Sequence, residues 1–298
     1  ALRATNPDLA ALLAAPVTRE AVERFLANRK FPIVDGDVVT FVFHGRADRV
    51  ALRHFIYGLP STQPFTRVPD TDFWFHELKL PECSRMEYKL EVERGGNTML
   101  LTDPFNPNLA HDPYGTNSVC QGKGYVLPDW TRFDPEARRG SLETLVVKSA
   151  ALGDERTVRV YVPARFRRRA RYSLLVAHDG DDYLRFSGMQ AVLDNLIHRL
   201  EIAPLIVAFV NPGARLVEYA AHEPHSRFLV DELLPVLDRK YPLIERPSAR
   251  GLLGASFGAV ASLSTAWRRP GVFGSLFLQS GSFGFYDEFM ATADILNF

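Results

Sequence analysis

The stretch GLLGASFGAV, residues 251–260, places a serine between two glycines where an apolar run gives way to an alanine-rich one. The residues before the serine have the composition of a buried strand, and FGAVASLSTAWRR (257–269) has helical spacing. A sharp strand-to-helix turn exposes a serine hydroxyl and requires small residues two positions before and after it, here Gly254 and Gly258. The pattern predicts that Ser256 is a nucleophile; the structural alternative is a serine that only caps the helix.

Strands and helices alternate through the C-terminal half of the sequence. YSLLVAHDG (172–180) is an apolar strand that runs into an acidic turn, and APLIVAFVNP (203–212) is typical of a strand buried on both faces. Helical spacing extends over FSGMQAVLDNLIHRL (186–200) and SRFLVDELLPVLDRKY (226–241). This alternation predicts an α/β domain with a mostly parallel sheet over residues 141–298.

The N-terminal half has a different periodicity. Residues 1–30 are rich in Ala and Leu at helical spacing, which predicts a helical segment. Between residues 31 and 125, short β-branched and aromatic runs alternate with Gly, Pro and Asp turns, which is typical of an antiparallel β-sandwich. Residues 126–140, which include PDWTRFDPEARRG, are expected to form a linker between the two domains.

The composition argues against several classes of protein. The 298 residues carry 35 Lys and Arg against 35 Asp and Glu, and this balance disfavours nucleic-acid binding. The absence of an apolar run of about 18 residues predicts no membrane span, and the N-terminus lacks the pattern of a signal peptide. Cys83 and Cys120 have no metal-ligand spacing, so we expect two free thiols in a reducing cytoplasm, no metal site and no cofactor.

A nucleophilic serine needs donors for the oxyanion that its attack creates. The first amides of a helix that begins after Ser256 point toward such an anion. An amide from the loop after an upstream strand can complete such an oxyanion hole. We assign these donors to the backbone amides of Phe257 and of Asp181, in HDGDDY (178–183). The aspartate side chains of that segment could equally form a solvated acidic turn.

Two arginines are candidate substrate contacts. Arg215 follows a buried strand, at the sheet edge where α/β proteins bind ligands, and can hold an anionic group by charge-assisted hydrogen bonds. An ion pair between Arg215 and Glu218 that only shapes the loop is an equal alternative. Arg185, just past HDGDDY, is the second candidate.

Five motifs together resemble a known family: HDG at 178, NPGARLVEY at 211, FLVDELLPVLDRKYP at 228, GLLGASFGA at 251 and SGSFGF at 280. They are similar to the putative esterase family of α/β-hydrolases, which includes enterochelin (ferric enterobactin) esterases, esterase D type enzymes, feruloyl esterases and mycolyltransferases. The DPFNPN and DPYGTNSV segments and the Trp-containing linker resemble the N-terminal part of enterochelin esterases.

The resemblance implies a cytoplasmic serine esterase that hydrolyses a catecholate siderophore, an enterobactin-like triester, to release iron. The ferric siderophore would be the small-molecule partner, and iron would arrive with the substrate rather than reside in the enzyme. A homo-oligomer is left open. The alternatives are another carboxylester hydrolase or acyltransferase of the family, such as a feruloyl or carbohydrate esterase, and a homologue that binds without cleaving.

The sequence departs from the family order of serine, acid and then histidine. All eight histidines precede Ser256. The acids after it come too soon after SGSFGF to match the pattern: Asp287, Glu288 and Asp294. We therefore expect a C-terminal truncation, with the triad acid and histidine beyond Phe298. A second chain could also supply them, or a histidine upstream of Ser256 could replace the base: His178, His222 or His225.

Overall fold

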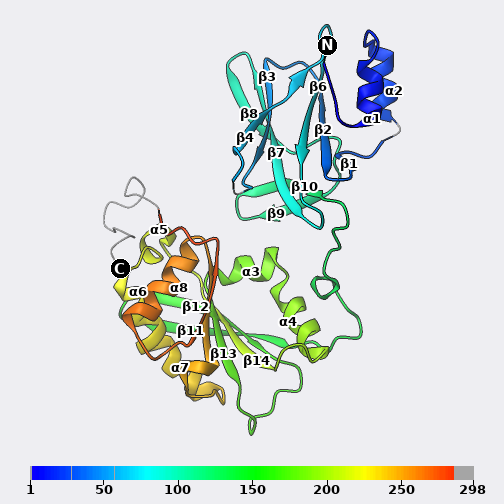
Figure 1. Ribbon diagram of the computed structural model, residues 1–298. Helices are drawn as coiled ribbons and strands as arrows, with labels where there is room; N and C mark the ends of the chain where they lie inside the picture. Colours follow the sequence, from blue (N-terminus) through cyan, green and yellow to red (C-terminus); the bar gives the residue numbers. More distant parts are fainter. Residues whose placement is uncertain (1, 28, 57, 285–298) are drawn as a thin grey trace. The chain divides into compact units, whose positions relative to one another are not determined.

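The computed structural model describes residues 2–27, 29–56 and 58–284 (Figure 1). The chain divides into two compact units, Ala1–Leu127 and Pro128–Phe298. No helix in the described part of the chain is long and apolar enough to cross a membrane. The acids Asp287, Glu288 and Asp294 lie outside the described residues.

The first unit begins with two short helices and continues with antiparallel strands. Asn6 caps the first helix, because its side-chain oxygen accepts the Leu9 N–H at 3.1 Å. The elements are α1 (Pro7–Leu13), α2 (Arg19–Ala27), β1 (Ile33–Asp35), β2 (Val38–His44), β3 (Arg49–His54), β4 (Thr62–Pro64), β5 (Thr66–Arg67), β6 (Phe73–Lys79), β7 (Arg85–Arg94), β8 (Asn97–Leu101), β9 (Leu109–Asp112) and β10 (Gly115–Gln121).

These strands form two sheets, in the orders β1-β2-β6-β5 and β4-β3-β7-β10-β9, with β8 paired to β7. Strand β2 is apolar on both faces. Phe41 and Phe43 belong to a buried cluster that includes Leu90 of the other sheet. Val42, which points the opposite way, belongs to a second cluster with Phe25 of α2. The four-stranded sheet is therefore covered by helices on one face and by the second sheet on the other.

The second unit is a single mixed sheet with helices on both faces (Figure 1). Its elements are η1 (Asp129–Thr131), β11 (Ser141–Ser149), β12 (Asp154–Val162), β13 (Ser173–Ala177), α3 (Gly180–Phe186), α4 (Met189–His198), β14 (Leu205–Phe209), α5 (Arg215–Glu218), α6 (Glu223–Arg227), η2 (Phe228–Leu233), α7 (Leu234–Lys240), η3 (Pro247–Ala249), β15 (Arg250–Ala255), α8 (Phe257–Arg268) and β16 (Ser275–Gln279).

The strand order is β11-β12-β14-β13-β15-β16. β14, β13, β15 and β16 are parallel neighbours, whereas β12 is antiparallel to both β11 and β14. Alternate residues of the central strands pack on opposite faces. In β14, Ile206 and Ala208 join the cluster that contains residues of η2 and α7, while Val207 and Phe209 pack beside Leu193 of α4. Burial on both faces explains why these strands are continuously apolar.

The segment predicted as a linker is largely ordered on the second unit. Asn195 of α4 is 1% exposed, and its Nδ2 donates to the carbonyl oxygens of Trp130 at 2.8 Å and Arg132 at 2.6 Å. Arg199 of the same helix bonds the Asp129 carboxylate at 2.7 Å. Residues from Pro128 onward are therefore part of the second unit rather than a spacer before it.

Truncation of the fully buried Leu252 in β15 is expected to destabilise the second unit. Leu252→Ala should lower the free energy of unfolding by about 2–5 kcal/mol, because it leaves a cavity in the central sheet. Chemical denaturation followed by tryptophan fluorescence measures the change. Val146, 62% exposed on β11, is the control: Val146→Ala should cost about 1 kcal/mol or less. Equal losses for the two variants would contradict the assigned core.

Candidate active site

Ser256 lies at a sharp turn between β15 and α8. Its backbone has φ 54° and ψ −119°, a conformation that a residue with a side chain rarely adopts. The strand and the helix lie very close together at this turn. A Cβ at Gly254 would be only 2.1 Å from the Gly258 carbonyl oxygen. A Cβ at Gly258 would lie 3.2 Å from the Cβ of His178. The G-x-S-x-G spacing thus reflects close backbone packing around a half-buried serine.

Strand β16 and the residues after it contact Ser256 from the other side. The Ser256 N–H donates to the Gln279 carbonyl oxygen at 2.9 Å, and the Ser282 N–H donates to the Ser256 carbonyl oxygen at 3.3 Å. The two hydroxyls, Ser256 Oγ and Ser282 Oγ, are 2.8 Å apart. The Tyr183 hydroxyl of α3 donates to the Gln279 side chain, so α3 and β16 are joined beside the nucleophile turn.

The loop after β13 supplies Asp179 and Gly180. Gly180 packs directly on β14, since a Cβ there would be 2.4 Å from that of Phe209. Asp179 has a left-handed backbone (φ 52°), and its N–H donates to the Tyr219 hydroxyl at 3.0 Å. The predicted acidic turn is therefore short, because helix α3 already begins at Gly180.

Of the two predicted oxyanion donors, one lies at the start of the expected helix, and the other lies in a helix rather than in the expected loop. Phe257 is the first residue of α8, directly after Ser256. Asp181 lies in the first turn of α3, and its N–H donates to Asn211 Oδ1 at 3.0 Å. Asn211, in the loop after β14, is a participant that sequence reasoning missed. A role for both amides at an oxyanion stays a prediction.

Arg215 forms an ion pair beside the turn, but not with the partner considered from the sequence. Its Nε and Nη2 bond the Asp179 carboxylate at 2.8 and 2.7 Å. The Arg215 guanidinium also lies 6.0 Å from the centre of the Phe257 ring. Glu218 pairs instead with Arg156 of β12, at 2.8 and 2.7 Å. Loop packing thus orients Arg215 toward Asp179, and a contact with substrate stays a prediction.

Arg185 lies in the last turn of α3 and is exposed. Its guanidinium stacks 5.0 Å from the centre of the Phe186 ring. Among the described residues, Arg185 makes no hydrogen bond or ion pair with Ser256 or its immediate neighbours, so its proposed contact with substrate also stays a prediction.

Two of the candidate replacement bases form a buried pair below the turn. His178 Nε2 and His225 Nε2 are 3.0 Å apart, and both side chains are almost fully buried. His178 Nδ1 faces the Leu253 carbonyl oxygen at 3.2 Å and Ser262 Oγ at 3.0 Å. A carbonyl oxygen can only accept, so His178 carries its proton on Nδ1 and accepts at Nε2 from His225.

Burial keeps this pair neutral. It lowers the pKa of His178 to about 4 and lowers the pKa of His225 well below its ordinary value. His225 Nδ1 is buried and has no hydrogen-bond partner in the described part of the chain, as is the case for His222 Nδ1. No hydrogen bond among the described residues connects these histidines to Ser256 Oγ, whose side-chain partner there is Ser282. The pair thus braces helix α8 through Ser262.

Comparison with known proteins gives a consistent result. Residues 149–290 match the family described as "Putative esterase". The chain is 29% identical over 150 residues to the uncharacterized protein YjcH of Bacillus subtilis, covering 48% of this chain and 62% of that one. It is 27% identical over 260 residues to the iron(III) enterobactin esterase of Dickeya dadantii, covering 75% of this chain and 59% of that one. The match thus spans less than two thirds of either relative.

A solved structure extends the likeness to both units. The crystal structure of ferric enterobactin esterase from Salmonella typhimurium superposes with a TM-score of 0.70 at 20% identity. It covers 88% of this chain and 77% of that one. This likeness shows that the two chains share a fold, and the family match together with the relatives confirms the resemblance to enterochelin esterases.

Replacing Gly254 is expected to disrupt the turn. Gly254→Ala should lower the free energy of unfolding by about 3 kcal/mol or more, because the new Cβ meets backbone atoms that cannot rotate away. Gly251 of the same strand is the matched control. Its Cβ would first meet the flexible Leu175 side chain at 3.3 Å, so Gly251→Ala should cost less than half as much. Denaturant titration compares them, and an unaffected Gly254→Ala would refute the packing described.

The buried histidine pair predicts a loss of stability in acid. The unfolded chain takes up protons near the ordinary histidine pKa of about 6.5, whereas folded His178 does so only near 4. Stability is therefore full above about pH 6.5 and falls as the pH drops toward 4, by up to about 1.4 kcal/mol per pH unit for each histidine. His225→Gln should flatten this slope in denaturant titrations across that range. His198→Gln, at an exposed position on α4, should leave the slope as it is.

Proposed function

From the match of residues 149–290 to the family described as Putative esterase, we propose that the chain is a serine esterase acting on a catecholate siderophore. The observation that carries the proposal is Ser256, at a strained strand-to-helix turn with positive φ. Such a turn presents a hydroxyl at the carboxyl edge of a parallel sheet, where α/β-hydrolases carry their nucleophile. The similarity to an iron(III) enterobactin esterase supports the choice of substrate class.

In the proposed reaction, Ser256 Oγ attacks an ester carbonyl and the carbonyl oxygen becomes an oxyanion. The backbone amides of Phe257 and Asp181 stabilise that charge. The Asp181 amide must then exchange its bond to Asn211 for one to the oxyanion. Ser282, hydrogen-bonded to Ser256 Oγ, holds the hydroxyl in place before the attack. The triad acid and histidine are not assigned to any described residue.

The substrate proposed is a cyclic or linear triester of 2,3-dihydroxybenzoyl-serine, with or without iron. Iron is cargo of the substrate in this scheme, and hydrolysis in the cytoplasm would release it. The ion pair with Asp179 orients Arg215 next to the nucleophile turn. We propose that Arg215, and Arg185 on α3, contact the anionic catecholate by charge-assisted hydrogen bonds.

The experiment measures hydrolysis of the catecholate triester by chromatography of the released acyl-serine. Ser256→Ala is expected to lose activity about a thousandfold or more, since the nucleophile cannot be replaced by its neighbours. Ser248→Ala, at an exposed position of η3, is the control and should retain full activity. Retention of activity by Ser256→Ala would refute the proposed nucleophile.

Two other outcomes would change the function. Turnover of feruloyl or acetylated sugars without turnover of catecholates would place the protein among the other carboxylester hydrolases. Binding of the siderophore with no turnover by the unmodified protein would identify a homologue that binds without cleaving. Both outcomes contradict the siderophore esterase proposed here.

A further inference from the structure

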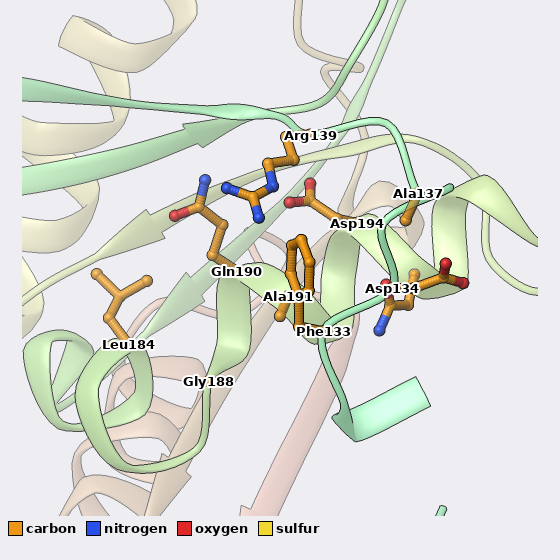
Figure 2. A pocket seen from close by; sticks show the side chains of 10 residues that line it. Phe133, Asp134, Ala137, Arg139, Leu184, Gly188, Gln190, Ala191 and Asp194 are labelled. Carbon is orange, nitrogen blue, oxygen red and sulfur yellow. The ribbon is translucent and has the colours of Figure 1, made fainter. Parts of the chain in front are cut away.

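A cavity of about 290 Å³ lies within the second unit, between the segment before β11 and the helices α3 and α4 (Figure 2). Phe133 and Arg139 line it from the segment, and Leu184, Ala191 and Asp194 line it from the helices. Within the described part of the chain, none of these residues is hydrogen-bonded to Ser256 or to the residues that hold it. The cavity is therefore a separate feature from the nucleophile turn.

Asp194 contributes a carboxylate to the lining of this cavity. Its side chain is only 5% exposed. Oδ1 accepts two hydrogen bonds, from the Gly140 N–H at 2.7 Å and from the Tyr161 hydroxyl at 2.7 Å. Oδ2 accepts none from the described residues. Oδ2 is therefore the oxygen of this carboxylate that stays accessible from the cavity, where a donor of a ligand can bind it.

Arg139 contributes a positively charged guanidinium to the same lining. Its guanidinium stacks 4.4 Å from the centre of the Phe133 ring. No carboxylate of the described chain lies within ion-pair distance of it. Figure 2 shows the Arg139 side chain extending over Phe133 toward the side where the Asp194 carboxylate lies. A ligand with a donor at one end and an acceptor anion at the other can bridge the two.

The remaining lining restricts the ligand further. Asp134, a second carboxylate in the lining, already faces Arg199 at 3.6 Å. Asp194 and the exposed Arg139 are thus the charged side chains of the lining without an ion-pair partner among the described residues, and a ligand that carries both charges can match them. Leu184, Ala191 and Ala137 add an apolar wall. A zwitterion with a small apolar group would match both the charged groups and the apolar wall of this lining.

We propose that this cavity binds a free α-amino acid with an apolar side chain. The ammonium group would donate to Asp194 Oδ2, the carboxylate would accept from Arg139, and the side chain would pack on Leu184 and Ala191. This site does not depend on the esterase activity proposed for Ser256. Its occupancy can therefore be tested whatever the outcome for that activity.

The test is titration calorimetry with L-leucine and L-phenylalanine as probes. Leucinamide lacks the carboxylate, and N-acetyl-L-leucine lacks the ammonium group. Each should bind at least about tenfold more weakly than L-leucine, because each loses one charge-assisted contact. Ser256→Ala should bind L-leucine as the unmodified protein does. Failure of both amino acids to bind with a Kd below about 10 mM would overturn the proposal.

Substitutions separate the two contacts. Arg139→Gln should weaken L-leucine binding about tenfold but leave leucinamide binding unchanged, and Arg139→Lys should restore part of the loss. Asp194→Asn should weaken L-leucine while keeping the acceptor for Gly140 and Tyr161, which thermal melting checks. Arg138→Gln, at the exposed neighbouring position, is the matched control and should bind normally. L-leucine binding that is equal in Arg139→Gln and Arg138→Gln would also overturn the proposal.

Discussion

The close approach of β15 to the start of α8 is the constraint on which the candidate site depends. A side chain at position 254 would overlap the backbone of residue 258, so the strand and the helix meet without side chains between them. Ser256 is left at the apex with positive φ, and its N–H is directed to the neighbouring strand β16. The position of the hydroxyl is thus fixed by backbone packing. A strained residue persists only where its surroundings determine it in this way.

A polar layer under and beside that apex connects loops that are distant in sequence. Tyr219 accepts from the Asp179 amide, and Asn211 accepts from the Asp181 amide, so the loop after β14 is bonded to the loop after β13. The buried Arg156–Glu218 pair adds the preceding strand β12. Desolvation offsets much of the energy of such pairs. Their effect here is therefore to fix the relative position of the loops around the serine more than to add stability.

The sequence predicted local features of the backbone but not the side-chain pairings between residues far apart in the chain. The turn at Ser256 follows from residues within two positions of it, and the apolar runs of β13 and β14 follow from burial on both faces. The partner of Glu218 lies 62 residues away in β12, whereas Arg215, three residues away, turns to Asp179. The histidines of the buried pair are 47 residues apart. Periodicity carries no information about such pairings, because they are created by the order of strands in the sheet.

The same reasoning explains why the sequence predicts a linker before β11. Its prolines and charges are typical of a linker, and nothing in it shows that α4 will hold it. The cause lies in two consecutive buried polar residues of that helix. Asn195 uses its amide donors on the carbonyls of Trp130 and Arg132, whereas Asp194 uses only one oxygen, on Gly140 and Tyr161. Because Asp194 anchors the segment through one oxygen only, its other carboxylate oxygen has no donor among the described residues. That oxygen contributes a polar group to the cavity.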